Sequence, residues 1–177
     1  NYAFLDAGLL EAWQLGAGAV ALANPLSAEL GVMRTRLLPG LVDALARNVA
    51  RQQSRVRLFE LGKTFADVNG EAPAETLRIA AVACGDAHAE QWGVSARAVD
   101  FHDIKGDLES LAALSGATLE FRASAQPFAH PGRSADIYRD GLAIGWIGQL
   151  HPRLQQVLGL HVDVLAFELA LEPLLAR

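Results

Sequence analysis

Cysteine is almost absent from this 177-residue sequence, which contains only Cys84. A single thiol cannot form a disulfide within the chain, so the small disulfide-stabilised secreted domains are excluded. Cys84 lies in an apolar run, and we interpret it as a small buried residue of a reducing compartment rather than as a reactive thiol.

Long apolar runs are also missing. A membrane helix needs about 20 consecutive apolar residues, whereas the longest run here, around residues 77–85, has the length of a strand and contains Arg78. No basic segment followed by an apolar one marks a secretory leader at Asn1. These absences predict a soluble, cytoplasmic protein without a membrane partner. The start at Asn1 without methionine favours a piece of a longer polypeptide.

The chain has no overall excess of basic charge. Lysine and arginine number 15 against 20 acidic residues, a net charge of −5, which does not indicate a nucleic-acid-binding protein. Residues 34–57 are an exception to this overall balance, because they contain six arginines and one acid, Asp43. Guanidinium groups at this density suit phosphates or the carboxylates of a partner, although a solvated helix face is the alternative. The candidate contacts are Arg34, Arg36, Arg47 and Arg51.

Motifs of catalysis and metal binding are missing too. No phosphate-binding glycine loop, nucleophile elbow or H-E-x-x-H pattern occurs. His130 and His151 each precede a proline and are more simply turn or helix-start positions, and His151 could cap a helix that begins at Pro152. We therefore assign no catalytic residue, no cofactor and no metal site to the chain.

Three helices are expected from the apolar spacing. One of about four turns begins at Pro39, where a missing N–H costs nothing. A second runs from Ile104 to Leu114 and is stopped by Gly116, and a short third, Pro152 to Leu158, is capped by Gly159. The first helix is amphipathic, because its apolar residues recur at helical spacing: Leu41, Val42, Leu45 and Val49.

The remaining regular segments are expected to be strands, and they predict the fold class. Asp140-Gly141 is a two-residue hairpin turn, and residues 67–73 are a turn-rich connection. Hairpins with helices inserted between them favour an antiparallel β-sheet flanked by helices, an α+β fold, in one domain over residues 1–177. The expected strands are Val56–Phe65 (largely buried and interrupted at Gly62), Leu77–Cys84, Leu119–Phe121, Ala135–Tyr138, Leu142–Leu150 and Val164–Leu171.

Four blocks, in this order, resemble the β subunit of bacterial phenylalanyl-tRNA synthetase. The resemblance spans nearly the whole chain. The blocks are residues 24–65 (with Asn24-Pro25-Leu26-Ser27, Met33–Leu41, Asn48 and Leu58–Phe65), Val99–Glu109, Phe128–Pro152 and Val164–Leu169.

The resemblance implies a module shaped like a class II synthetase catalytic domain without being one. In that family the active site, which uses ATP and Mg²⁺ to attach phenylalanine to tRNA(Phe), belongs to the α subunit, and two α and two β chains assemble. It implies a structural or assembly role for this chain, with the candidate arginines contacting the α subunit or tRNA. The alternative is an inherited pocket that still binds ATP, an amino acid or a regulatory small molecule.

The family comparison also implies a degenerate ATP motif. When the chain is aligned on Ala166-Phe167, Glu168 and Ala170 stand at glycine positions and Pro173 where an arginine would be. A glutamate facing a triphosphate is repulsive, and proline cannot donate a bidentate contact. An active site would also carry an arginine on a strand–loop–strand unit, for which the short connection before Leu58 leaves no room.

Overall fold

A six-stranded antiparallel sheet forms the centre of the protein, in the order β3-β4-β8-β7-β6-β5. The computed structural model describes residues 2–25, 27–68 and 72–176. The sheet confirms the predicted α+β class. Its strands are β3 (Val56–Ala66), β4 (Ala74–Cys84), β5 (Glu120–Ala123), β6 (Ala129–Arg139), β7 (Leu142–Leu150) and β8 (Leu165–Ala170).

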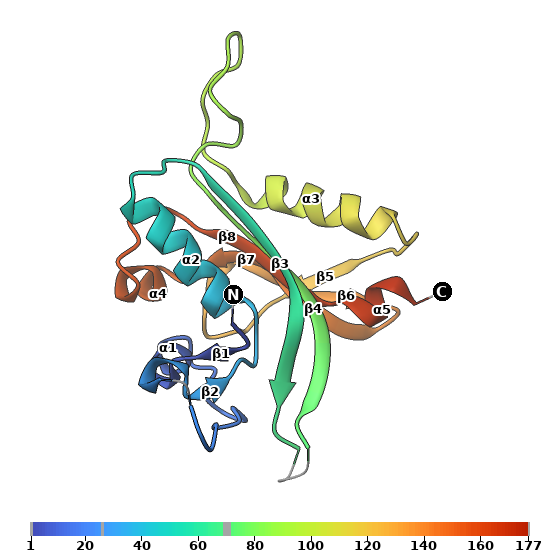
Figure 1. Ribbon diagram of the computed structural model, residues 1–177. Coiled ribbons are helices and arrows are strands. Elements are labelled where there is room, and N and C mark those ends of the chain that lie inside the picture. Colours follow the sequence, from blue (N-terminus) through green and yellow to red (C-terminus); the bar gives the residue numbers. More distant parts are fainter. Residues whose placement is uncertain (1, 26, 69–71, 177) are drawn as a thin grey trace.

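Helices cover both faces of the sheet (Figure 1). One face carries α2 (Leu38–Ala50) and α4 (Pro152–Val157), and the other carries α3 (Phe101–Ala113) and α5 (Leu171–Leu175). Because successive residues of a strand point to opposite faces, β8 supplies both cores. Ala166 packs in the α2 layer, whereas Leu165 and Phe167 pack in the α3 layer. No helix among the described residues is long and apolar enough to cross a membrane.

Residues 2–25 and 27–37 form a small lobe that the sequence did not predict. It contains β1 (Phe4–Leu5), α1 (Ala7–Ala12), a 3₁₀ turn (Ala28–Leu30) and β2 (Val32–Met33), which pairs antiparallel with β1. These elements are too short for a periodic pattern to show. Trp13, directly after α1, is fully buried, and its ring centroid lies 5.5 Å from that of Phe128. This contact joins the lobe to the main core.

The predicted cap of α4, the stop of α3 and the hairpin turn are confirmed, whereas α3 begins at Phe101 rather than Ile104 and α2 at Leu38 rather than Pro39. Nδ1 of His151 accepts a hydrogen bond from the N–H of Arg153 at 3.0 Å, which caps α4. Gly116 follows α3 with a φ of 69°. Asp140 and Gly141 join β6 to β7 with φ values of 50° and 78°, as a type I′ turn requires.

Three strand predictions were wrong. β3 is a continuous edge strand rather than a largely buried one interrupted at Gly62, because Gly62 fits beneath Arg34 (an added Cβ would lie 2.3 Å from Nη2). β6 begins at Ala129, ahead of an irregularity in its pairing, and β4 begins at Ala74. The middle of the predicted turn 67–73, residues 69–71, lies outside the described residues.

The aromatic centre of the α2 layer gives a test of this packing. The fully buried Phe128 lies between Trp13 and Trp146, with centroids 5.5 and 5.1 Å away. We expect Phe128→Ala to lower the free energy of unfolding by about 3–5 kcal/mol, because a cavity is left. The matched control Phe59→Ala, at a 78% exposed position, should change it by less than about 0.5 kcal/mol. If urea denaturation showed that Phe128→Ala and Phe59→Ala lower the free energy of unfolding equally, this packing would be contradicted.

Candidate functional site

A buried carboxylate occupies the centre of the degenerate motif. Glu168 lies on β8 with its side chain fully buried, facing α2. Its Oε2 accepts hydrogen bonds from the N–H groups of Leu37 and Leu38, each at 3.0 Å. The first N–H groups of a helix have no partner within the helix. Glu168 therefore caps α2 from a strand 130 residues away in the sequence.

Two arginines lie near this carboxylate. Nε of Arg78 is 3.7 Å from Oε1 of Glu168 and donates to Oγ1 of Thr64 at 3.1 Å. The guanidinium of Arg36 lies over the ring of Phe128, 5.3 Å from its centroid. Burial raises the pKa of Glu168 above its usual value, and the two cations oppose this shift. Burial likewise lowers the pKa of Arg36.

A small cavity of about 200 Å³ opens beside this group. Ligand pockets usually measure about 300–1,000 Å³, so the cavity is small for a nucleotide. Two fully buried atoms in this region, Nε1 of Trp146 and Oε1 of Glu168, have no hydrogen-bond partner among the described residues. The lining residues include Arg36, Arg78, Gln126, Asp136, Trp146 and Ala170.

The structure brings together only part of the predicted degenerate motif. Ala170 lines the cavity and Glu168 stands behind it, but Pro173 belongs to α5, which packs on the opposite face. The carbonyl of Pro173 accepts a hydrogen bond from Arg139 at 2.7 Å. The expectation that no strand–loop–strand unit could form is wrong, since β3 and β4 pair along their whole length as such a unit.

The four candidate arginines have different environments. Arg34 is buried: its Nη1 pairs with Glu60 at 2.6 Å and its Nε donates to the carbonyl of Lys63 at 2.8 Å. Arg36 is half-buried against Phe128. Arg47 pairs with Asp43 on the exposed side of α2, and Arg51 directly follows α2 and is exposed. Arg34 thus serves internal contacts, while partner contacts through Arg47 and Arg51 stay a prediction.

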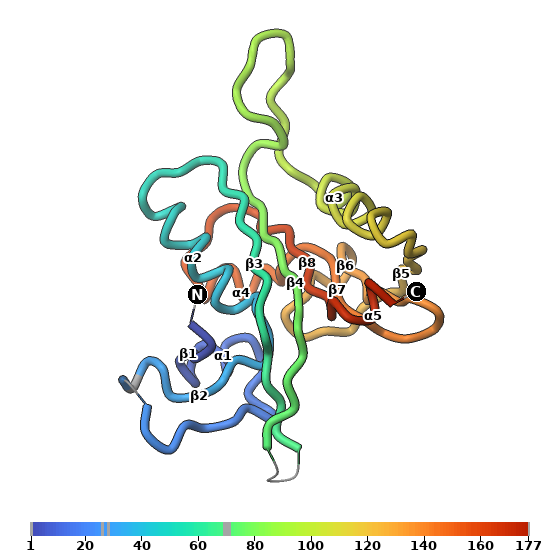
Figure 2. The backbone as a smooth tube through the Cα atoms, turned by 45° about the vertical axis from the view of Figure 1, so that its right-hand side comes forward, coloured from blue at the N-terminus to red at the C-terminus, as the bar shows by residue number. Residues whose placement is uncertain are grey.

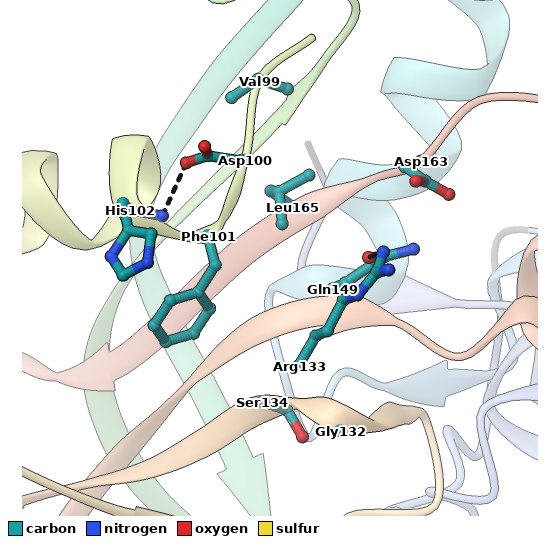
Figure 3. A pocket seen from close by; sticks show the side chains of 10 residues that line it. All are labelled: Val99, Asp100, Phe101, His102, Gly132, Arg133, Ser134, Gln149, Asp163 and Leu165. Carbon is teal, nitrogen blue, oxygen red and sulfur yellow. Dashed lines mark hydrogen bonds between the residues drawn. The ribbon is translucent and has the colours of Figure 1, made fainter.

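A second, larger cleft of about 530 Å³ lies between the start of α3 and strands β6 to β8 (Figure 3). Nη1 of Arg133 donates to Oε1 of Gln149 at 3.0 Å. Asp163 lies beside them, and Phe101 and His102 face them across the cleft. Sequence reasoning missed this cleft, because its residues come from four separate segments and match no motif. Nowhere in the described residues are three or more His, Cys, Asp or Glu side chains placed to hold a metal.

The start of α3, at the edge of this cleft, is closed by its own side chains. Asp100 accepts from the N–H groups of His102 and Asp103, and Asp103 accepts from the N–H of Asp100, which forms a capping box. Arg97 adds two hydrogen bonds to Asp103 and holds the pKa of that carboxyl well below its usual range.

Comparison with known proteins identifies the family of this chain. Residues 1–171 match the family described as the phenylalanyl tRNA synthetase beta chain CLM domain. This chain belongs to that family. This chain is 68% identical over 178 residues to the phenylalanine–tRNA ligase beta subunit of Xanthomonas campestris pv. campestris (strain 8004), and the match covers all of this chain and 22% of that protein.

A second relative matches to a similar extent. This chain is 66% identical over 179 residues to the phenylalanine–tRNA ligase beta subunit of Xylella fastidiosa (strain Temecula1), and the match covers all of this chain and 23% of that protein. The chain therefore spans about a fifth of the length of the curated relatives that it matches.

The contacts of Glu168 predict a large effect of its removal. Glu168→Ala leaves the N–H groups of Leu37 and Leu38 without their acceptor and removes the negative charge beside Arg36 and Arg78. We therefore expect the free energy of unfolding to fall by about 3–5 kcal/mol at pH 7. Glu168→Gln keeps one acceptor oxygen and should lose less.

The Glu168→Gln variant also tests how protonation of Glu168 affects stability. Because the folded pKa of Glu168 is raised, its protonation adds stability below the unfolded pKa of about 4.3, and this added part is lost as the pH rises through the folded value. We expect Glu168→Gln to remove this part of the pH dependence in denaturation curves. An unchanged pH profile would contradict the assignment.

At the start of α3, the pH dependence of the stability is expected to have the opposite sign. Asp103 has a depressed pKa, so its contribution is present above the unfolded value of about 3.9 and is lost as the pH falls through the lower folded value. Asp103→Asn should lower the melting temperature at pH 7, and this effect should shrink progressively as the pH is lowered below about 4. The control Asp140→Asn changes an exposed carboxylate in the β6–β7 turn. An Asp103→Asn effect that does not depend on pH would argue against this role.

Proposed function

We propose that residues 1–177 form one non-catalytic module of a phenylalanyl-tRNA synthetase β subunit, with a class II synthetase-like fold and an assembly role. In this proposal the cytoplasmic holoenzyme, two α and two β chains, attaches phenylalanine to tRNA(Phe) with ATP and Mg²⁺ at an active site on the α subunit. Glu168 is the observation that carries the proposal, because it stands at the degenerate motif and caps α2.

Two carboxylates oppose nucleotide binding beside Glu168. A triphosphate here would meet Arg36 and Arg78, but also the carboxylates of Asp136, which lines the cavity with them, and of Glu168 behind it. Turning Glu168 away would leave the N–H groups of Leu37 and Leu38 without an acceptor. Since an unpaired buried polar group costs about 1–3 kcal/mol, the fold itself opposes opening the site.

An uncovered apolar ladder supports the assembly role with the α subunit. Phe59 pairs with Ala81 and Leu61 with Ile79 on the edge of the sheet, and Phe59 and Leu61 are 78% and 54% exposed. No described strand pairs with the outer edge of β3. Proteins usually cover or charge such edges, and contiguous exposed apolar patches mark interaction sites.

The alternative function is a retained small-molecule site. The unpartnered Nε1 of Trp146 and the half-buried Arg36 favour it, since both could donate to a ligand. The volume of about 200 Å³ suits an amino acid or a regulatory small molecule better than ATP.

Calorimetric titration distinguishes the two functions. We expect no heat of binding when the chain is titrated with ATP, phenylalanine or a phenylalanyl-adenylate analogue to millimolar concentration, with the αβ holoenzyme as the positive control. Saturable binding that disappears in Arg36→Gln would support the retained site and contradict the non-catalytic assignment.

The exposed arginines of α2 give a second test. In the reconstituted holoenzyme, the double substitution Arg47→Glu and Arg51→Glu should weaken either assembly with the α subunit or tRNA binding at least about tenfold, equivalent to about 1.4 kcal/mol. Arg153→Glu, at an exposed position of α4, is the matched control. If sedimentation and filter binding show both affinities unchanged, these arginines are only a solvated helix face.

A further inference from the structure

Residues 86–98, here called the arm, connect β4 to α3 and project away from the sheet in both views (Figures 1 and 2). The two sides of the arm meet near its base. Asp86 forms a bridge with Ala98, and the N–H of Ala87 donates to the carbonyl of Arg97 at 2.8 Å. The arm is therefore a loop with a paired stem.

The stem is fixed to the body of the protein from two directions. On the β3 side, Nη2 of Arg57 donates to the carbonyl of Ala87 at 3.0 Å, and Nε of Arg55 donates to that of Asp86 at 3.2 Å. On the α3 side, Arg97 forms its two bonds to Asp103. These contacts hold the arm in place before any partner arrives, which lowers the ordering cost of binding.

A glycine is required where the stem leaves β4. Gly85 has a φ of 80°, and an added Cβ would lie 1.9 Å from the carbonyl oxygen of Ser54. The close approach of these two backbones sets the direction in which the arm leaves the sheet.

The outer part of the arm carries a tryptophan with no contact to the rest of the protein. Trp92 is fully exposed (102%) and Val94 is 47% exposed, whereas the other two tryptophans, Trp13 and Trp146, are 0% exposed. Tryptophan is enriched among the residues that dominate binding energy in interfaces. The exposed indole of Trp92 is buried against nothing within the described residues, so it is free to contact another molecule.

The chemistry of the arm favours a protein partner over RNA. The arm contains the acids Asp86 and Glu90 and one basic residue, Arg97, whose charge is paired with Asp103. Proteins that stack aromatic side chains on nucleotides combine them with a basic surface. The acids instead complement a protein surface that carries basic groups.

We propose that the arm docks Trp92 into an apolar socket, flanked by basic groups, on the α subunit of the synthetase. This inference rests on the proposed assembly function and adds the surface that carries it. Trp92 supplies the buried apolar area, and Glu90 and Asp86 set the orientation of the arm.

Photo-crosslinking in the reconstituted holoenzyme tests the partner. With p-benzoylphenylalanine in place of Trp92, we expect the major crosslink to join the β chain to the α subunit. The matched control places the same group at Leu142, an exposed position in the β7 strand, and should give no such crosslink. Crosslinks only within the β chain, only to added tRNA, or to nothing would each overturn the proposal.

An affinity measurement tests the energetic role. Trp92→Ala should weaken association of full-length β with α at least about 30-fold, the range of a strong interface residue, without changing the melting temperature of isolated β. Val157→Ala, at a 60% exposed position, should leave affinity unchanged. Glu90→Lys should also weaken association, with the difference from wild type shrinking at high salt.

The outcomes separate this proposal from the proposed function. Wild-type β that fails to bind α at all would contradict the assembly function itself. Wild-type β that binds α, together with Trp92→Ala that binds equally well, would contradict only the role of the arm.

Discussion

The carboxylate of Glu168 links the sheet to the helix layer above it, and much of the structure depends on this link. Capping from β8 fixes where α2 begins, because the N–H groups of Leu37 and Leu38 must meet Oε2. The position of α2 in turn places Leu41 and Leu45 in the core. A charge in this position is costly by itself, since burial raises the pKa of Glu168. The two N–H groups and the nearby arginines offset that cost.

The same arrangement occupies the position on β8 that the proposed degenerate motif assigns to a nucleotide site. In this chain the acceptor for the start of α2 comes from the strand position that would have to stay open for a ligand. Glu168 therefore cannot serve both the helix and a phosphate-binding surface. Arg78, which bonds Thr64, and Arg36, which packs on Phe128, are oriented by neighbours within the chain. What remains is a cavity of about 200 Å³ beside this cluster of polar side chains.

Local signals in the sequence predicted local structure well. The Asp140-Gly141 turn, the cap by His151 and the spacing of Leu41, Val42 and Leu45 each act within a few residues, so the chain alone determines them. The antiparallel α+β class followed from these elements, and the family followed from the order of the four blocks.

Features that depend on distant partners could not be predicted in this way. Val56–Phe65 has the composition of a buried strand, but its place at the edge of the sheet depends on the β-strand order. Gly62 reads as a strand breaker until Arg34 is seen above it. The cleft near Arg133 draws on four segments, and the role of Glu168 depends on two N–H groups 130 and 131 residues away.

The arginine-rich stretch shows that many arginines in a short segment need not form a basic surface that a partner can reach. Six arginines between positions 34 and 57 suggest a basic binding surface, yet most bond or stack on the chain itself. Arg34 pairs with Glu60, Arg36 covers Phe128, and Arg55 and Arg57 hold the stem of the arm. Arg47, which pairs with Asp43 on α2, and Arg51, which follows α2, are the two that remain exposed without a contact outside the helix region. Two of the six arginines thus position the arm and two others are held within the body of the protein, so the groups on offer to a partner are apolar and acidic as well as basic.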